Sequence, residues 1–406
     1  MATTTTYPKL RNLGVQGVMH AGKPALLLRD PLNLSDRAMV IPQQIAFILP
    51  LLDGTHAPSE VRAAVAARTG IVLPEGLVER MVAQLDEAFL LENERFEQAV
   101  EAKRVAYRAA PYREPSSAGY SYPADPKALR RLLDGYLDRL EAPPEIVPEA
   151  RGVLSPHIDY QRGGLAYART WASAAEAVRE AELVVVFATD HNAPTNRITL
   201  TRQHYATPYG VLPTDQEVVA GLAAVIGEEA AFADELHHIS EHAIELPLTW
   251  LHHMRAGAPC RVVPILCGSF QPFIEDARNP WDDATLNAVI DYLRPVVSAP
   301  KALVMASGDL AHMGPAFGGS PLGLVERAQV QVADNRLIEN LVAGSAEGFF
   351  CTIKDEGDRR NVCGTAPFYM ALRALSPARG VRAAYDRCPA DDHNTSVVSI
   401  AGVVME

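Results

Sequence analysis

Histidine and aspartate side chains follow apolar runs at three separate places in this sequence. His157 ends RGVLSPH and His191 ends ELVVVFATDH, while Asp309 and His312 close KALVMASGDLAH. If these runs are neighbouring parallel strands, their carboxyl ends meet at one edge of a sheet, where α/β proteins bind ligands. Imidazoles and carboxylates gathered there predict a metal site with His157 and His191 as ligands. The alternatives are an ordinary loop histidine at 157 and buried polar groups that hold a turn at 309 and 312.

One cysteine directly precedes a predicted helix. Cys363 lies in RNVCGTAPFYMAL, and the helix is expected to begin near Thr365. Backbone N–H groups at a helix start stabilise a thiolate, which is both a nucleophile and a metal ligand. The alternative is a buried, inert cysteine, and this is our interpretation of the other four cysteines of the chain.

A further histidine cluster lies in LHHISEHAIELPL, residues 236–248. His238 and His242 are four residues apart and would share one helix face, as in zinc-protease motifs. In those motifs a glutamate follows the first histidine as general base, and Ile239 stands in its place here. A zinc protease is therefore not expected, and Glu241 and His242 are predicted to border the same cleft as the other candidates.

Strands and helices in alternation must position these residues. Apolar runs rich in β-branched residues, such as ELVVVFATDH, RVVPILCG and VVSIAGVV, are separated by helix-like stretches such as LAYARTWASAAEAVRE. This pattern predicts an α/β domain over residues 118–406, with a mostly parallel sheet covered by helices on both faces.

Residues 1–105 are expected to form a separate small domain, joined by a linker at 106–117 that is rich in Pro, Ser and Ala. PALLLRDP predicts a strand, residues 41–54 one helix, residues 59–68 a second that ends at Gly70, and Pro74 the start of a third. Strands with three helices predict a winged-helix-like domain. Residues 1–100 hold nine Lys and Arg against eleven Asp and Glu, which argues against DNA reading and favours peptide docking or a scaffolding role.

Composition narrows the class of protein. The net charge of −12 argues against a nucleic-acid partner, because phosphate binding needs a concentrated basic surface. No apolar run approaches the roughly 20 residues of a membrane helix, and the start MATTTTYPKL lacks the features of a secretory signal. Five cysteines do not make a disulfide framework. A cytoplasmic protein without a membrane partner is expected.

Seven motifs together resemble the Memo family, which includes the B component of the AmmeMemoRadiSam system. They occur in the family's order and spacing from residue 118 to the C-terminus: AGYSYPADPKALRRLLDGYL, SPHIDY, TDHNAP, YATPYG, SEHAIELPL, SGDLAHMG and NVCGTAP. The resemblance implies a three-layer α/β/α fold similar to the class III extradiol dioxygenases, which use non-haem iron. It also implies a radical-SAM protein as a partner. The N-terminal domain resembles the peptide-binding winged-helix family of the pyrroloquinoline quinone pathway.

The resemblance assigns roles to particular residues. The family's metal ligands fall on His157, His191 and Cys363, and the motif that faces the metal falls on Asp309 and His312. Its acidic-His motif, at the rim of the site, falls on Glu241 and His242. The implied cofactor is one divalent metal ion, with iron expected and copper or zinc as alternatives.

Two classes of function follow. The first is a non-haem iron, dioxygenase-like oxidoreductase in which His312 acts as acid or base, on a small molecule or on a precursor peptide docked by the N-terminal domain. The second is a metal-binding or peptide-binding adaptor protein without turnover.

Overall fold

The chain divides into two compact units, Met1–Ala109 and Ala110–Glu406, called here the N-terminal and C-terminal units. The structure is a computed structural model that describes residues 7–35, 37, 39–193, 195 and 197–406. The division lies close to the boundary expected at residue 105. The segment 106–117, expected as a linker, instead continues helix α3 (Glu94–Ala109) and then carries the buried side chains of Arg113 and Ser117.

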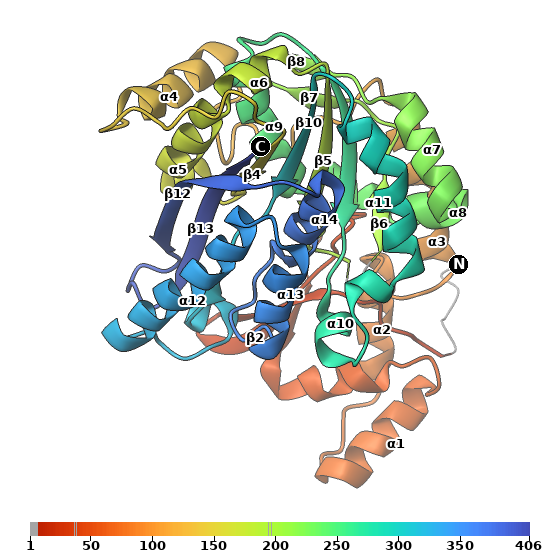
Figure 1. Ribbon diagram of the computed structural model, residues 1–406. Coiled ribbons are helices and arrows are strands. Elements are labelled where there is room, and N and C mark those ends of the chain that lie inside the picture. The colour runs from red at the N-terminus through yellow and green to blue at the C-terminus, as the bar shows by residue number, and fades with distance from the viewer. Residues whose placement is uncertain (1–6, 36, 38, 194, 196) are drawn as a thin grey trace. The chain divides into compact units, whose positions relative to one another are not determined.

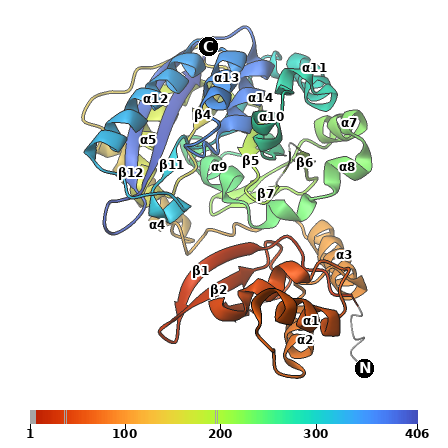
Figure 2. The ribbon, with the colours of Figure 1, turned by 90° about the horizontal axis from the view of Figure 1, so that it is seen from below.

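The N-terminal unit combines an antiparallel sheet of order β1-β2-β3 with helices (Figure 2). Its first two strands form a hairpin whose turn is made by Ala21 and Gly22, both with positive φ, as the twist of a two-residue hairpin requires. The elements are β1 (Gly14–His20), β2 (Lys23–Arg29), β3 (Met39–Pro42), the 3-10 helix η1 (Gln43–Leu51), α1 (Pro58–Thr69), α2 (Leu77–Glu87) and α3.

The expected helices of this unit are partly corrected. Helix α1 covers the expected residues 59–68, and Gly70 ends it in the left-handed conformation. The helix expected over 41–54 is the 3-10 helix η1, because Pro50 lies inside it and lacks the N–H that an α-helix would use there. Helix α2 begins at Leu77, three residues after the expected start. Helix α3 was not predicted, because its outer faces are polar and only Tyr107 is buried.

The C-terminal unit is built on an eight-stranded sheet of order β11-β13-β4-β10-β5-β9-β6, with β12 paired to β13. The strands β4, β10, β5 and β9 are mutually parallel, and β6 and β11–β13 are antiparallel to their neighbours. The α/β prediction is confirmed, and the sheet is mixed, with its parallel strands at the centre. The strands are β4 (Gly152–Ser155), β5 (Leu183–Thr189), β6 (Ile198–Leu200), β9 (Arg261–Cys267), β10 (Ala302–Ser307), β11 (His312–Met313), β12 (Gly380–Pro389), β13 (Val397–Met405) and a separate pair, β7 (Tyr205–Thr207) and β8 (Gly210–Leu212).

Helices cover both faces of this sheet, and alternate residues of β5 show it. Val185 and Phe187 pack into one core with α7, α11, α13 and α14, whereas Val184 and Val186 pack into a second core with α4, α5 and α9. Figure 1 shows α11, α13 and α14 in front of the sheet. The helices are α4 (Pro126–Asp138), α5 (Tyr160–Ser173), α6 (Ala175–Glu180), α7 (Gln216–Ile226), α8 (Glu228–Phe232), η2 (Glu235–Ile239), α9 (His242–Met254), α10 (Gln271–Glu275), η3 (Pro280–Asp282), α11 (Ala284–Val297), η4 (Pro315–Phe317), α12 (Leu324–Val342), α13 (Ala346–Asp355) and α14 (Thr365–Leu375). Within the described ranges, no helix is long and apolar enough to span a bilayer.

A buried carboxylate fastens the start of the C-terminal unit to α9. Glu245 forms an ion pair with Arg113, and both side chains are almost wholly buried. Its oxygens also accept hydrogen bonds from the backbone N–H groups of Ser116 and Ser117, each at 2.8 Å, and from the Tyr122 hydroxyl at 2.5 Å. Because burying an ion pair is favourable only when its remaining hydrogen bonds are satisfied, these contacts explain why residues 113–122 pack against the domain.

Glu245→Gln should release this segment. The change leaves the Arg113 guanidinium buried without its counter-charge, which costs about 3 kcal/mol or more. Trypsin cleavage after Arg113 is expected to be slow in the parent protein and many times faster in the variant, because cleavage follows the population of the opened segment. Glu182→Gln, which removes an exposed ion pair with Lys301, is the control and should leave cleavage unchanged. Equal cleavage rates in the parent and Glu245→Gln would show that Glu245 does not hold the segment.

Candidate metal centre

The candidate site lies at the carboxyl ends of three adjacent strands, because β4, β10 and β5 are parallel neighbours. His157 follows β4, His191 follows β5 and Asp309 follows β10, while His242 opens α9 and Cys363 lies just before α14. The sheet therefore brings together side chains that are up to about 200 residues apart in the sequence, as the pattern of strand ends predicts.

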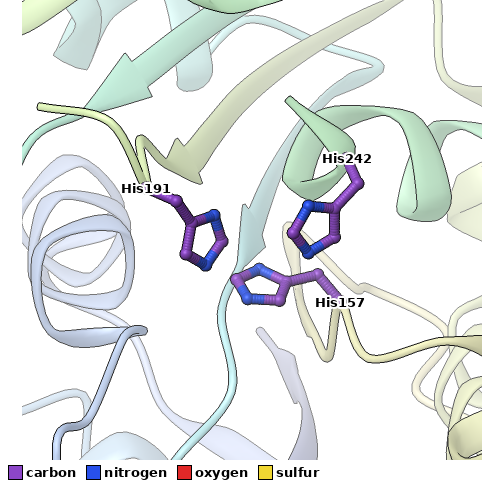
Figure 3. Close-up of side chains that lie close together, drawn as sticks. All are labelled: His157, His191 and His242. Atoms are coloured by element: carbon purple, nitrogen blue, oxygen red, sulfur yellow. The ribbon is translucent and has the colours of Figure 1, made fainter. Parts of the chain in front are cut away.

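Three imidazole rings converge at this edge. The ring centroids of His157 and His191 are 5.0 Å apart, those of His157 and His242 are 5.3 Å apart, and those of His191 and His242 are 4.9 Å apart. One nitrogen from each ring lies within 4.8 Å of the other two. Figure 3 shows the three rings pointing toward one another from the ends of separate elements. This spacing is short enough for the three nitrogens to share one metal ion.

A second group of ligand atoms shares His157. The Cys363 Sγ atom is 3.2 Å from His157 Nε2, and one Asp309 oxygen is 3.9 Å from the same nitrogen. The three residues together offer ligand atoms within 4.8 Å of one another. Asp309 also fixes this group, because its Oδ1 accepts the backbone N–H of His157 at 2.9 Å and its own N–H donates to Cys363 Sγ at 3.2 Å.

Hydrogen bonds to Nδ1 set which nitrogen each imidazole offers. His191 and His242 both direct Nδ1 to the same oxygen of Glu241, at 3.0 and 3.2 Å. His157 Nδ1 lies 3.3 Å from the Ser307 hydroxyl, whose own hydrogen goes to the Ala243 carbonyl. Each Nδ1 therefore acts as a hydrogen-bond donor, and each Nε2 is the nitrogen left to bind a ligand once it carries no proton. Such an outer carboxylate is the usual companion of metal-binding histidines.

Burial and charge oppose one another in this group. Burial, reinforced by the neighbouring imidazoles, holds the pKa of His157 well below its usual range, so the ring is neutral and able to bind a cation. Burial also lowers the pKa of His191, but the Glu241 carboxylate and Cys363 outweigh it and hold that pKa well above the usual value. For Glu241, burial raises the pKa, and the two imidazoles outweigh it, so the pKa is well below normal. Glu241 is therefore a buried carboxylate anion.

Burial is the largest influence on the pKa values of the thiol and the second carboxyl. Burial raises the pKa of Cys363, with His191 acting in the opposite direction, and burial raises the pKa of Asp309. The helix start at Thr365 does not by itself make Cys363 a thiolate, contrary to the sequence-based argument. A bound cation reverses this balance, because coordination removes the proton of a thiol.

His312 lies beside the group but belongs to neither set of ligand atoms. Its Nδ1 contacts the carbonyl oxygens of Leu310 at 3.2 Å and Asn361 at 3.1 Å, so Nδ1 donates and Nε2 is unprotonated. Burial lowers its pKa, and the ring packs edge-on against Phe317. A neutral imidazole with one anchored and one available nitrogen can accept a proton near neutral pH.

The structure brings all seven predicted site residues to one edge of the sheet and changes the place of two of them. Glu241 was expected at the rim, but its side chain is 2% exposed and stands behind two imidazoles; it caps α9 by accepting the Ala243 N–H. His242, also expected at the rim, is 44% exposed yet joins the three-imidazole group. Ser307, which orients His157, was missed because a serine at a strand end carries no distinctive signal.

His238 does not share a helix face with His242. It lies in the 3-10 helix η2, and the break at Ser240 and Glu241 separates it from α9. Its Nδ1 is 2.6 Å from the Tyr205 hydroxyl and its Nε2 is 3.2 Å from the Thr199 carbonyl, so it is a neutral histidine of the core.

Comparison with known proteins agrees with the motifs. A family model described as Memo-like protein matches residues 113–404. A MEMO1 family protein of Aquifex aeolicus is 25% identical over 385 residues, which cover 93% of this chain and 95% of the relative. Relatives of the same name from Methanopyrus kandleri and Thermus thermophilus are each 28% identical, over 66% and 71% of this chain and 89% and 81% of their own lengths. The Aquifex alignment is long enough to extend into the N-terminal unit.

Glu241→Gln should weaken metal binding. Glutamine keeps the shape of the side chain but removes the charge that orients His191 and His242, and losses of this kind reduce metal affinity about 10- to 100-fold. Calorimetric titration with Co²⁺ or Fe²⁺ under argon measures the dissociation constant of the metal. His157→Ala should abolish binding, and Glu235→Gln, a change at another buried glutamate, should not affect it. Unchanged affinity in Glu241→Gln would remove the carboxylate from the site.

Acid should destabilise the fold through His238. Burial lowers its pKa to about 3, whereas the unfolded residue titrates near 6.5. Below pH 6.5 the unfolded state binds the extra proton, so stability falls by up to about 1.4 kcal/mol per pH unit until the pH nears the folded pKa. His238→Gln, which can replace both hydrogen bonds, should show a smaller drop in melting temperature between pH 7 and pH 5 than the parent. Parallel pH profiles of the two proteins would contradict this assignment.

Proposed function

The chain belongs to the Memo-like protein family, and we propose that its C-terminal unit is a divalent-metal centre, with iron as the native ion, that performs dioxygenase-like oxidation. The observation that carries the proposal is the convergence of three imidazoles, oriented by Glu241 and Ser307, next to a thiol and a carboxyl group. The resemblance of the Memo family to non-haem iron dioxygenases supports the reaction class.

The donor set fits such an ion. Neutral imidazole nitrogens suit iron, copper and zinc, and the Cys363 sulfur suits copper or zinc as well as iron. His157 is 2% exposed, whereas the side chains of His191 and His242 are 36% and 44% exposed. The group is thus enclosed on one side and accessible on the other. Catalytic metal sites have this arrangement, because they leave one coordination position open to water or substrate. A bound iron ion would supply Lewis-acid and redox chemistry there.

The chain's own residues supply the proton chemistry. His312 presents Nε2 as a base, because Nδ1 is held by two carbonyl oxygens. Asp309, whose pKa is raised by burial, lies close to both His157 and Cys363 and can hold a proton for them. Phe317 packs against the His312 ring and is 37% exposed, so it offers an apolar surface to a substrate beside the base.

A second candidate function is metal handling or an adaptor role without turnover. The close approach of Cys363 Sγ to His157 Nε2 favours it, because mixed sulfur and imidazole ligands also suit copper. Oxygen consumption by the iron-loaded protein separates the two functions, since an adaptor consumes none.

For the N-terminal unit we propose a peptide-docking role. Strand β3 is an edge strand of the sheet in the part of the chain that the structure describes, and a groove of about 560 Å³ lies between β3 and α2. Met39, Ile45 and Leu77 give it an apolar lining, with Arg37 and Glu87 at its border. An extended peptide can add a strand to such an edge and place alternate side chains in the groove. This winged-helix-like unit would raise the peptide's effective concentration at the metal centre, and a radical-SAM protein of the AmmeMemoRadiSam type is the partner proposed for the same peptide.

His312→Ala should separate metal binding from turnover. The variant is expected to bind Fe²⁺ with the parent's stoichiometry, because His312 belongs to neither group of ligand atoms. Its oxygen consumption with a substrate peptide or catechol-like molecule should fall by about 100-fold or more, the usual contribution of a general base. Cys363→Ser should instead weaken metal binding or change which metal is taken up. A His312→Ala protein that loses its metal would make His312 a ligand.

Ile45→Asp should impair peptide binding without affecting the metal. A charge in the apolar groove disfavours burial of a peptide side chain, so the dissociation constant of a candidate peptide should rise about tenfold or more. Val72→Asp is the matched control, since Val72 is 85% exposed and does not line the groove. Fluorescence anisotropy with labelled peptides measures binding, and equal affinities in the two variants would exclude the groove.

A further inference from the structure

A buried charged pair joins helix α12 to the turn before Cys363, and neither member belongs to the two groups of candidate ligand atoms. Asp334 lies in the middle of this helix and is fully buried, and it forms an ion pair with Arg360, whose side chain is 7% exposed. Arg360 also donates to Glu356 at 2.8 Å. Among the described residues its Nη2 is a buried donor without a hydrogen-bond acceptor. An unsatisfied donor and two buried charges are unfavourable for folding, and apolar side chains of similar volume would often be at least as stable at these positions.

The backbone beside Arg360 holds His312. The Arg360 carbonyl accepts the His312 N–H at 2.6 Å, and the Asn361 carbonyl accepts His312 Nδ1 at 3.1 Å. The Asn361 side chain donates back to the His312 carbonyl at 3.2 Å. Asp358 and Asn361 both have positive φ, a conformation that costs free energy in residues other than glycine and needs support from its surroundings. The Arg360 side chain, anchored in the core between these two residues, provides that support.

The same turn leads directly to Cys363. Its Sγ accepts the Asp309 N–H at 3.2 Å, and the following Gly364 N–H donates to the Asp309 carbonyl at 2.9 Å. A displacement of the turn at residue 360 therefore moves the thiol relative to Asp309 and His157.

Asp334 reaches the other loop of the site through Ser399. The Ser399 hydroxyl is among the groups that lower the pKa of Asp334, which burial raises overall. The same hydroxyl accepts the Ala311 N–H at 2.9 Å, and the Ser399 carbonyl accepts the Leu310 N–H at 2.8 Å. These contacts fix the two residues between Asp309 and His312. The Tyr385 hydroxyl donates to the remaining Asp334 oxygen at 3.0 Å. The Asp334 carboxylate is thus linked to two segments of the site. Arg360 connects it to residues 360–363, and Ser399 connects it to residues 310–312.

We propose that Asp334 and Arg360 form a positioning pair that sets the placement of His312 and Cys363 at the metal-binding edge of the sheet. Neither residue touches the candidate ligands' metal-facing atoms, and they act through the backbone of residues 310–312 and 360–363. The significance of this placement for catalysis rests on the proposed function, whereas the placement itself is a property of the metal-free protein.

The test compares two variants with a control of similar stability. Asp334→Asn keeps the shape and removes the charge, and the double variant Asp334→Leu with Arg360→Met replaces the pair by apolar groups. Val289→Ala opens a cavity at the buried face of α11, a helix outside both loops, and serves as the control. Melting temperature reports stability. In the metal-free proteins, imidazole ¹⁵N spectra report the His312 tautomer, and peptide mapping after timed alkylation reports the reactivity of Cys363.

We expect Asp334→Asn to convert His312 from a single Nδ1–H tautomer to a mixture and to increase the alkylation rate of Cys363 about tenfold. The double variant should recover much of the melting temperature while keeping both altered signals, and Val289→Ala should lower the melting temperature with both signals unchanged. Cobalt-loaded protein should show a matching shift in thiolate-to-Co²⁺ absorption. Parent-like tautomer and thiol reactivity in the double variant would overturn the proposal, as would equal changes in Val289→Ala.

Failure of the proposed function is seen separately. If the parent protein binds neither Fe²⁺ nor Co²⁺, the metal-centre proposal is lost, and the tautomer and alkylation measurements still decide the role of the pair. If Asp334→Asn does not fold, the double variant carries the test, because it contains no unpaired buried charge.

Discussion

The site depends on one buried anion, Glu241. A carboxylate without solvent is costly unless hydrogen-bond donors and positive charge surround it, and here those donors are two imidazole Nδ1–H groups and two backbone N–H groups. The same contacts hold the His191 and His242 rings so that one nitrogen of each lies close to the other. Burial of the carboxylate and orientation of the imidazoles therefore depend on each other. The carboxylate needs the imidazole N–H donors, and the imidazoles need the carboxylate as acceptor.

The sheet determines which residues can take part. Parallel neighbours β4, β10 and β5 end at one edge, so the first residues after each strand become spatial neighbours without any contact in sequence. Antiparallel β13 lies beside β4 and contributes Ser399, a core residue, rather than a ligand. The two helix layers supply the remaining groups at their N-terminal ends, where α9 brings His242 and the segment before α14 brings Cys363.

The sequence was sufficient for the α/β class and for the gathering of His157, His191, Asp309 and His312, because strand ends can be located from apolar runs alone. It was insufficient for the parts that depend on tertiary partners. A glutamate beside a histidine is typical of a surface position, and only the fold shows that Glu241 is buried. The ion pair of Asp334 and Arg360 joins a helix to a turn 26 residues away, and no local pattern marks it. The helix expected over 41–54 is present as η1, but apolar spacing does not distinguish a 3-10 helix from an α-helix.

The Arg113–Glu245 pair also has a mechanical meaning. The two units of the chain are joined at Ala109 and Ala110, and the side chain of Arg113, only three residues further on, forms a buried ion pair with Glu245 in the first turn of α9. A pulling force applied to the N-terminal unit thus reaches a buried ion pair almost at once. Because Glu245 lies one turn after His242 on α9, a displacement of the ion pair would act on the helix turn that carries one of the three imidazoles. The covalent connection between the units is therefore short, and a force applied through it would load the Arg113–Glu245 ion pair near the start of the C-terminal unit.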